Sequence, residues 1–205
     1  MRAVFLDLDG TLTDPKPGIT GAAAHALETL GLPVPDDLTW IIGPPLIDSF
    51  RRLGAPDPEK ALGLYREVYA AGRMFENAVY PGIPQALAAM RAAGARLYLA
   101  TAKPHVYATR ITAHFGLDAY LDEQFGPELD GTRNDKAELL AWALARTGAE
   151  PGTCVMVGDR RQDFVAAAAN GMRSVGVTWG YGSAEELALA DRLCDAPADL
   201  PAAVG

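Results

Sequence analysis

The sequence predicts an α/β fold, a doubly wound parallel sheet of the Rossmann type that carries an inserted helical module. Three observations lead to this fold class. Short apolar runs alternate with helical patterns along most of the chain, the alternation stops between residues 15 and 80, and polar residues directly follow several of the apolar runs. Alternating strands and helices are typical of parallel sheets built from βαβ units.

Five short apolar runs have the length and composition of buried parallel strands. They lie at residues 3–8, 96–101, 122–125, 154–158 and 174–179. Between them, apolar residues three and four apart predict helices at residues 84–93, 106–115, 136–146 and 164–170. The carboxyl ends of these strands should meet at one edge of the sheet, where open α/β sheets bind ligands.

Residues 15–80 interrupt this alternation. They contain helical patterns at residues 20–30, 45–53 and 58–77 and no convincing strand. Turn-forming residues at 14–18 and 80–82 predict hinges on either side. We therefore expect a helical cap at 15–80 and a core made of 1–14 and 81–205, with both hinges near strand ends, where the cap can act as a lid.

Composition narrows the class of protein. The chain has 205 residues, 49% of them apolar and 21% charged, which is the balance of a soluble globular protein. A net charge of −8 and the lack of a Lys/Arg block argue against a nucleic-acid polymer as partner. No apolar run suits a signal peptide or a membrane span, so we expect a cytoplasmic protein that does not bind membranes. Cys154 and Cys194 are expected to be buried thiols.

Asp7 and Asp9 follow the first predicted strand, in the stretch AVFLDLDGTLT. Side chains of a strand alternate between its faces at about 3.3 Å per residue, so both carboxylates are expected on one face, roughly 6 to 7 Å apart. At that separation two like charges repel by about 2 to 3 kcal/mol at an effective dielectric constant of about 20. Such a site needs a cation, a shared proton or both. Gly10 permits a sharp turn whose N–H groups face an anion.

Three further strand or helix ends carry residues suited to the same chemistry. The Thr-Ala-Lys segment at 101–103 joins a strand to a helix start, whose free N–H groups suit a phosphate oxygen. Lys136 lies near a helix start and supplies a fixed positive charge. Asp159 and Asp163 follow a buried strand and add two carboxylates. Together these residues predict a phosphate and metal site at the carboxyl edge of the sheet.

Taken in order, DxDGT at 7–11, Thr101, Lys136 and GDxxxD at 158–163 resemble the motifs of the haloacid dehalogenase (HAD) superfamily, in its phosphatase branch. The resemblance covers essentially the whole chain and implies a helical cap between the first and second motifs, where residues 15–80 fall. GPPLIDSF at 43–50, TAKPHVYA at 101–108 and LDGTRNDKAELL at 129–140 look like the phosphoglycolate phosphatase-like group, some members of which are described as 5′-nucleotidases. Ile47 departs from that group, where a polar or charged residue is expected.

The resemblance implies a role for each acidic residue. Asp7 would be the nucleophile that forms an aspartyl phosphate. Asp9 would act first as general acid and then as general base, with its backbone carbonyl on the metal. The cofactor would be Mg²⁺, bound by Asp7 and Asp159. Asp163 would orient the water shell of the metal or bind the metal itself.

The remaining motif residues are implied to bind substrate. Thr101 and Lys136 would hold the transferring phosphoryl group, where positioning and charge neutralisation supply most of the catalysis. Gly10 and Ala102 complete the phosphate-binding set. Lys103 would face either a second anionic group of the substrate or solvent.

The expected activity is Mg²⁺-dependent hydrolysis of a small phosphorylated metabolite through an aspartyl-phosphate intermediate. Phosphoglycolate phosphatase-like activity is the first choice, and a 5′-nucleotidase or another sugar or cofactor phosphatase is the alternative. A phosphomutase and a catalytically silent phosphate-binding module also remain open, because the core motifs do not separate them. The cap residues that read the substrate, and the oligomeric state, are not determined by these patterns.

Overall fold

The computed structural model describes residues 2–205 and divides the chain into two compact units. The larger unit runs to Asp14 and resumes at Val79, and the smaller unit is Pro15–Ala78. The chain therefore crosses between the units twice, after Asp14 and after Ala78.

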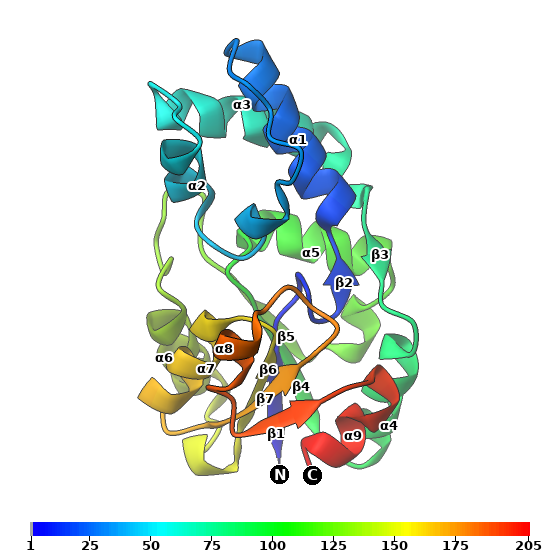
Figure 1. Ribbon diagram of the computed structural model, residues 1–205. Helices are drawn as coiled ribbons and strands as arrows, with labels where there is room; N and C mark the ends of the chain where they lie inside the picture. Colours follow the sequence, from blue (N-terminus) through cyan, green and yellow to red (C-terminus); the bar gives the residue numbers. More distant parts are fainter. Residues whose placement is uncertain (1) are drawn as a thin grey trace. The chain divides into compact units, whose positions relative to one another are not determined.

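A six-stranded parallel sheet forms the centre of the larger unit (Figure 1). Its strands lie in the order β5-β4-β1-β6-β7-β8, and every neighbouring pair is parallel. The strands are β1 (Ala3–Leu6), β4 (Arg96–Ala100), β5 (Glu123–Phe125), β6 (Val155–Gly158), β7 (Arg173–Val177) and β8 (Arg192–Cys194). Because β1 lies between β4 and β6, the ends of these three strands form a switch point of the kind at which α/β sheets bind ligands.

Helices cover both faces of this sheet, with α6 and α7 on one face and α4 and α9 on the other (Figure 1). The helices of the larger unit are α4 (Ile83–Ala92), α5 (His105–His114), α6 (Lys136–Thr147), α7 (Arg161–Ala169), α8 (Ala184–Leu187) and α9 (Leu200–Ala203). Short 3-10 turns occupy Asp118–Tyr120, Pro151–Thr153 and Pro197–Asp199. None of the helices in residues 2–205 combines the length and the apolar character that a membrane span requires.

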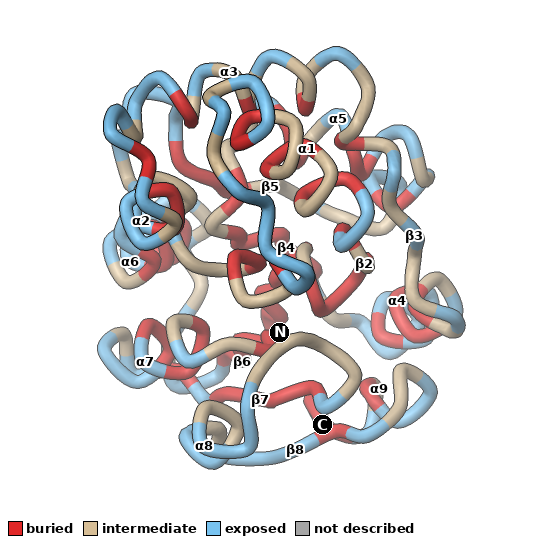
Figure 2. Tube along the Cα trace, turned by 45° about the horizontal axis from the view of Figure 1, so that its top comes forward, coloured by how far each residue is buried: buried red, intermediate tan, exposed pale blue. Residues whose placement is uncertain are grey.

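The core of the larger unit follows from the alternation of side chains along β1 and β4. Phe5 stacks on Tyr98 with ring centroids 5.0 Å apart, and both belong to a buried cluster with Leu139 and Leu140 of α6. The other face of β1 is buried as well, since Val4 and Leu6 have no exposed surface. The central strands β1, β4, β6 and β7 are buried along most of their length, whereas the edge strands β5 and β8 are partly exposed (Figure 2). A parallel sheet covered on both faces needs apolar residues at consecutive positions, which explains the uninterrupted apolar runs.

The smaller unit is helical. It contains α1 (Lys16–Thr29), α2 (Leu46–Arg52) and α3 (Pro58–Ala71), with 3-10 turns at Thr39–Ile41 and Arg73–Phe75. Aromatic rings join α2 to α3, because Phe50 contacts Tyr65 at 6.3 Å between centroids and Tyr65 stacks on Tyr69 at 5.2 Å. Asp57 caps α3 by accepting a hydrogen bond from the backbone N–H of Lys60 at 3.0 Å.

The residues beside the two crossings pair with each other. β2 (Thr13–Asp14) and β3 (Ala78–Val79) form a two-stranded sheet, and the N–H of Tyr80 donates to the carbonyl of Leu12 at 3.1 Å. The sequence predicted no strand between 15 and 80, so this expectation is wrong at β3. Two residues are too short for a period-two pattern to be visible.

Other elements also differ from expectation. α1 begins at Lys16 and includes three residues expected in the hinge; Pro17 lies in its first turn, where a missing N–H costs no helical hydrogen bond. α3 ends at Ala71 rather than at 77, and α7 begins at Arg161 rather than at 164. β8, α8 and α9 were not predicted, because elements of three or four residues hold too few side chains to define a period.

Candidate active site

The predicted site residues gather at the carboxyl ends of neighbouring strands. β1 ends at Leu6, so Asp7 and Asp9 lie in the turn that follows it rather than in the strand. Thr101 follows β4, and Asp159 follows β6. Because β4 and β6 flank β1, segments 152 residues apart in the chain, such as Asp7 and Asp159, end at one edge of the sheet.

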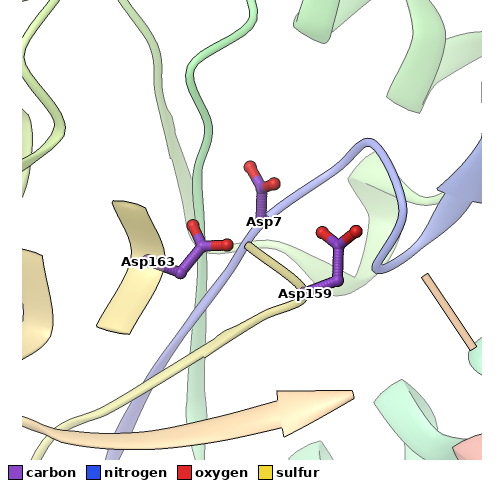
Figure 3. Close-up of side chains that lie close together, drawn as sticks. All are labelled: Asp7, Asp159 and Asp163. Atoms are coloured by element: carbon purple, nitrogen blue, oxygen red, sulfur yellow. The ribbon is translucent and has the colours of Figure 1, made fainter. Parts of the chain in front are cut away.

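Three buried carboxylates form the centre of the site. Oxygen atoms of Asp7, Asp159 and Asp163 all lie within 4.8 Å of one another, and Figure 3 shows the three carboxyl groups gathered beside the ends of the strands. The N–H of Asp7 donates to the carbonyl of Val157 in β6 at 2.9 Å, which continues the pairing of β1 with β6 past its last strand residue. Asp163 lies in the first turn of α7 and accepts from the N–H of Arg160 at 3.0 Å.

Lys136 connects two of these acids. It is the first residue of α6, and Asp135 caps that helix by accepting from the N–H groups of Ala137 and Glu138. Its buried ammonium Nζ lies 2.9 Å from Asp7 Oδ1 and pairs with Asp163 Oδ1 as well. Burial alone would lower the pKa of Lys136, but the attraction of Asp163 and then of Asp7 outweighs it and raises the pKa, so the lysine stays charged.

Burial also sets the pKa of Asp163. It raises the pKa of this carboxyl from 3.8 to about 6, against the lowering effect of the Lys136 charge. Both carboxylate oxygens of Asp163 are engaged, one by the helix N-terminus and one by Lys136. This side chain therefore fixes the lysine in place.

A second lysine holds Asp9. Lys103 Nζ lies 2.8 Å from Asp9 Oδ2, and the side chain of Lys103 is only 5% exposed. Of the two positions foreseen for Lys103, the solvated one is wrong, because this side chain is buried in the site. Burial raises the pKa of Asp9, Lys103 works against that rise, and the Asp7 charge adds to it. A raised pKa is the direction needed for a carboxyl group that donates a proton.

Asp159 is held from two sides. The N–H of Tyr181 donates to its Oδ2 at 2.7 Å, and the hydroxyl of Thr11 donates to its Oδ1 at 3.4 Å. Burial raises its pKa well above the usual value, and the charges of Asp163 and Asp7 raise it further. Gly10 adopts a positive φ of 82°, and a Cβ atom there would overlap the Asp159 carboxylate, so this turn requires glycine.

The Thr101 segment lies at the end of β4. Its backbone N–H donates to the carbonyl of Phe125 at 3.0 Å, and its buried hydroxyl accepts from the N–H of Lys103 at 3.2 Å. Ala102 is half-buried in the turn between them. This hydrogen bond orders the turn that carries Lys103 into the site.

The donor set fits a hard divalent cation. Carboxylate oxygen is the ligand type that Mg²⁺ prefers, and Asp7, Asp159 and Asp163 offer it within one small space. Two lysines offset only half of the charge of four ionised carboxylates, so a dication would bring the group to neutrality. Asp9 Oδ1 is a further buried acceptor. It has no hydrogen-bond partner among residues 2–205, so the protein itself does not satisfy it.

Some residues at this site were not predicted. Thr11 was quoted within the first motif but given no role, yet it contacts Asp159. Asp14, Trp179 and Tyr181 were not connected with the acids at all. The signal available in the sequence is Gly180-Tyr181-Gly182 after a predicted strand, because glycines on either side of a tyrosine let the backbone approach another group closely.

With this geometry in view, the comparison with protein-family models decides the family. Residues 1–171 match the model for haloacid dehalogenase-like hydrolases. The chain belongs to this family. A six-stranded parallel sheet with helices on both faces is the HAD fold, so the predicted fold class is confirmed.

Several known proteins resemble the chain over most of its length. A 5′-nucleotidase of Pseudomonas aeruginosa is 42% identical over 90% of this chain and 86% of its own. The tyrosine-protein kinase PtkA of Mycobacterium tuberculosis is 44% identical over 90% of this chain, which spans 64% of the length of PtkA. The crystal structure of a predicted phosphatase from Clostridium acetobutylicum has a TM-score of 0.92 and 36% identity, covering 98% of this chain and 96% of that one. Phosphoglycolate phosphatases also match, at 29% identity.

Proposed function

We propose that this phosphatase of the HAD family hydrolyses a small phosphorylated metabolite with Mg²⁺, through a phosphoryl group carried transiently on Asp7. The observation that carries the proposal is the pairing of two acids with two buried lysines, the buried Asp7 with Lys136 and the largely buried Asp9 with Lys103, at one edge of the sheet. Buried charges are costly unless they are paired or bind a ligand. An arrangement of this kind has a chemical use.

In the first step, a carboxylate oxygen of Asp7 attacks phosphorus, and the bond from phosphorus to the ester oxygen breaks. The leaving oxygen takes a proton from Asp9. Lys136 and Thr101 hold the equatorial oxygens of the phosphoryl group. When bound among the three buried acids, Mg²⁺ supplies positive charge that offsets the repulsion between the carboxylates and the substrate dianion.

In the second step, Asp9 accepts a proton from a water molecule that attacks the phosphorus of the aspartyl phosphate. Phosphate leaves and the Asp7 carboxylate is regenerated, and the proton taken from water replaces the one that Asp9 gave to the leaving group. Asp163 fixes Lys136, and through it the position of Asp7, and it contributes to the metal site by orienting water.

The first experiment measures release of inorganic phosphate from p-nitrophenyl phosphate across a Mg²⁺ titration. Activity that disappears with EDTA and returns with excess Mg²⁺ supports the proposal. Full activity of the metal-free protein would overturn its Mg²⁺ requirement. Substrate choice is then measured with 2-phosphoglycolate, nucleoside 5′-monophosphates, sugar phosphates and pyridoxal phosphate. We place a nucleoside 5′-monophosphate ahead of 2-phosphoglycolate, because the 5′-nucleotidase is 42% identical to this chain and the phosphoglycolate phosphatases 29%.

The PtkA relatives favour a second candidate, in which the phosphoryl group passes to a tyrosine hydroxyl instead of to water. Incubation with radiolabelled ATP and a tyrosine-containing copolymer tests this reaction, with Asp7→Asn as the control. Label on the copolymer that depends on Asp7 would favour transfer. Release of free phosphate alone favours hydrolysis. Product analysis with a sugar phosphate separates hydrolysis and transfer to tyrosine from phosphomutase activity. If no activity is detected in any assay, a phosphate-binding module is the remaining function.

A further inference from the structure

The segment at residues 179–181, here called the aromatic strap, follows β7 and contacts four separate parts of the larger unit. The indole N–H of Trp179 donates to the carbonyl of Thr11 at 3.1 Å, and its ring meets the ring of Tyr80 edge-on with centroids 6.5 Å apart. The N–H of Tyr181 donates to Asp159 at 2.7 Å, and its hydroxyl donates to Asp14. A segment of three residues thus contacts the nucleophile loop, an expected metal ligand and both crossings of the chain.

The glycines on either side of Tyr181 explain how the strap comes so close to Asp159. A Cβ atom at Gly180 would overlap both Asp159 and the carbonyl oxygen of Gly10, and one at Gly182 would overlap the backbone carbonyl of Asp159. Neither glycine has a positive φ, so the requirement is close approach and not backbone conformation. The Gly-Tyr-Gly sequence therefore packs the strap backbone directly against the Asp159 residue.

The side chain of Tyr181 is anchored where the chain leaves and re-enters the larger unit. Its partner Asp14 is the last residue before the first crossing, and Tyr80, which shares a side-chain hydrogen bond with Tyr181, is the second residue after the return crossing. Burial raises the pKa of Tyr181, and the hydrogen bond to Asp14 raises it further, so the phenol keeps its proton. The two crossings are also joined directly by the hydrogen bond from Tyr80 to Leu12.

We propose that Tyr181 is a positioning residue that couples the metal ligand Asp159 to both crossings of the chain. Its backbone N–H orients the Asp159 carboxylate, and its phenol fixes that N–H by binding Asp14 and Tyr80. Any coupling between two sites is reciprocal, so a metal held by Asp159 must stiffen the crossings to the extent that the crossings favour metal binding. This proposal rests on the Mg²⁺ site of the proposed function.

The test uses Tyr181→Phe, which keeps the ring and the backbone N–H but removes the hydroxyl. Mg²⁺ binding is measured by calorimetry, and hydrogen exchange is measured at residues 12–14 and 79–82 with and without Mg²⁺. Loss of one buried hydrogen bond should weaken Mg²⁺ binding about 3- to 10-fold. In the wild type, Mg²⁺ should slow exchange at both crossings, and in Tyr181→Phe this effect should shrink by a similar factor.

Two further variants make the result specific. Tyr120→Phe makes the same chemical change in a 3-10 turn of the larger unit and should leave both measurements unchanged. Asp14→Ala removes the acceptor; if the phenol acts through Asp14, the double variant Tyr181→Phe/Asp14→Ala should be little worse than either single one. Asp14→Ala also replaces Tyr181→Phe as the test if the latter does not fold.

The outcomes separate this proposal from the proposed function. No Mg²⁺ binding by the wild type would overturn the metal site itself. Equal Mg²⁺ binding by wild type and Tyr181→Phe, within twofold, would overturn only the coupling. In a third outcome, Tyr181→Phe exchanges faster than the wild type at the crossings by the same factor with and without Mg²⁺, and its Mg²⁺ affinity is unchanged. That result would show that Tyr181 supports the fold and does not position Asp159.

Discussion

The two units differ most in where they place charged side chains. In the larger unit, Asp7, Asp159, Asp163, Lys103 and Lys136 are all buried. In the smaller unit, every Asp, Glu, Lys and Arg is exposed or partly exposed, and the one buried polar side chain is that of Ser49. Charged residues are almost never buried without a partner, because removing them from water is costly.

We infer from this difference that the larger unit performs the chemistry. The larger unit keeps four carboxylates and two lysines together at an energetic cost that their pairing offsets in part and that a bound cation would offset further. The smaller unit uses aromatic packing around Tyr65 and leaves its charged side chains exposed or partly exposed. We therefore expect substitutions in the larger unit to remove reaction steps and substitutions in the smaller unit to change substrate preference.

The largest expected effect tests whether Asp7 performs the chemistry. Asp7→Asn should lower the rate of hydrolysis on the order of 10⁴-fold or more, because an amide does not replace a carboxylate nucleophile. The fold should persist, since the variant removes one of several buried like charges, and thermal unfolding checks this. The matched control Asp118→Asn, at an exposed position, should keep full activity. An active Asp7→Asn enzyme would contradict the assignment.

The second prediction separates the two half-reactions. Asp9→Asn should slow hydrolysis of the aspartyl phosphate by about 10² to 10⁴, the usual contribution of general acid–base catalysis. With p-nitrophenyl phosphate the leaving group needs little acid help, so stopped-flow mixing should show a burst of about one nitrophenolate per enzyme, the ratio expected when an acylated or phosphorylated enzyme accumulates. An alkyl phosphate should give no burst. A burst in Asp7→Asn, or wild-type turnover in Asp9→Asn, would show that the roles are assigned wrongly.

The third prediction concerns how the free energy of unfolding depends on pH because the carboxyl group of Asp163 is buried. In EDTA, the pKa of Asp163 is raised to about 6 in the folded protein, while the unfolded chain has the usual 3.8. Between these pH values the folded state holds more protons than the unfolded state, so the free energy of unfolding falls as the pH rises from about 4 to 6. Relative to Asp163→Asn, the free energy of unfolding of the wild type should fall by on the order of 1 to 3 kcal/mol over this pH range.

Urea unfolding at pH 4 and pH 6.5 measures this difference. With saturating Mg²⁺ the trend should reverse, because the metal binds the deprotonated carboxylates and stabilises the folded state. If the free energy of unfolding depends on pH in the same way for the wild type and for Asp163→Asn in EDTA, Asp163 titrates normally. Burial of its carboxyl group then costs the larger unit no stability.

The smallest expected effect lies in the smaller unit. Arg51 pairs with Asp48 at the surface, and the guanidinium of Arg52 lies 4.2 Å from the centre of the Trp40 ring. Replacing Arg51, Arg52 or Lys16 by Ala should change the ratio of kcat/KM values between two natural phosphate esters several-fold, while kcat on p-nitrophenyl phosphate stays within about twofold. Lys60→Ala, in exposed surface of α3, serves as the control. Equal losses on all substrates would place these residues in folding or in catalysis.

Much of the fold could be predicted from the sequence because the buried parallel strands are continuous apolar runs. The runs around Phe5, Leu99 and Met156 identify central strands, since both faces of such a strand are covered. The motif acids were also visible, because two carboxylates on one face at the end of a buried strand repel each other unless a cation or a shared proton relieves the repulsion. The short edge strand β8 and the two-residue strand β3 were not predictable, because they owe their form to hydrogen bonds with a neighbour.

The sequence alone indicates which polar groups follow strands or begin helices, and Asp7, Asp9, Lys136, Asp159 and Asp163 could all be identified from pattern and spacing. The pairing of these groups follows from the tertiary fold. Lys103 pairs with Asp9, and Lys136 bridges Asp7 and Asp163. Tyr181 connects Asp159 with Asp14. These contacts join residues up to 167 positions apart in the chain. Local periodicity carries no information about such contacts, because they depend on strand order and on glycines that let one backbone approach another.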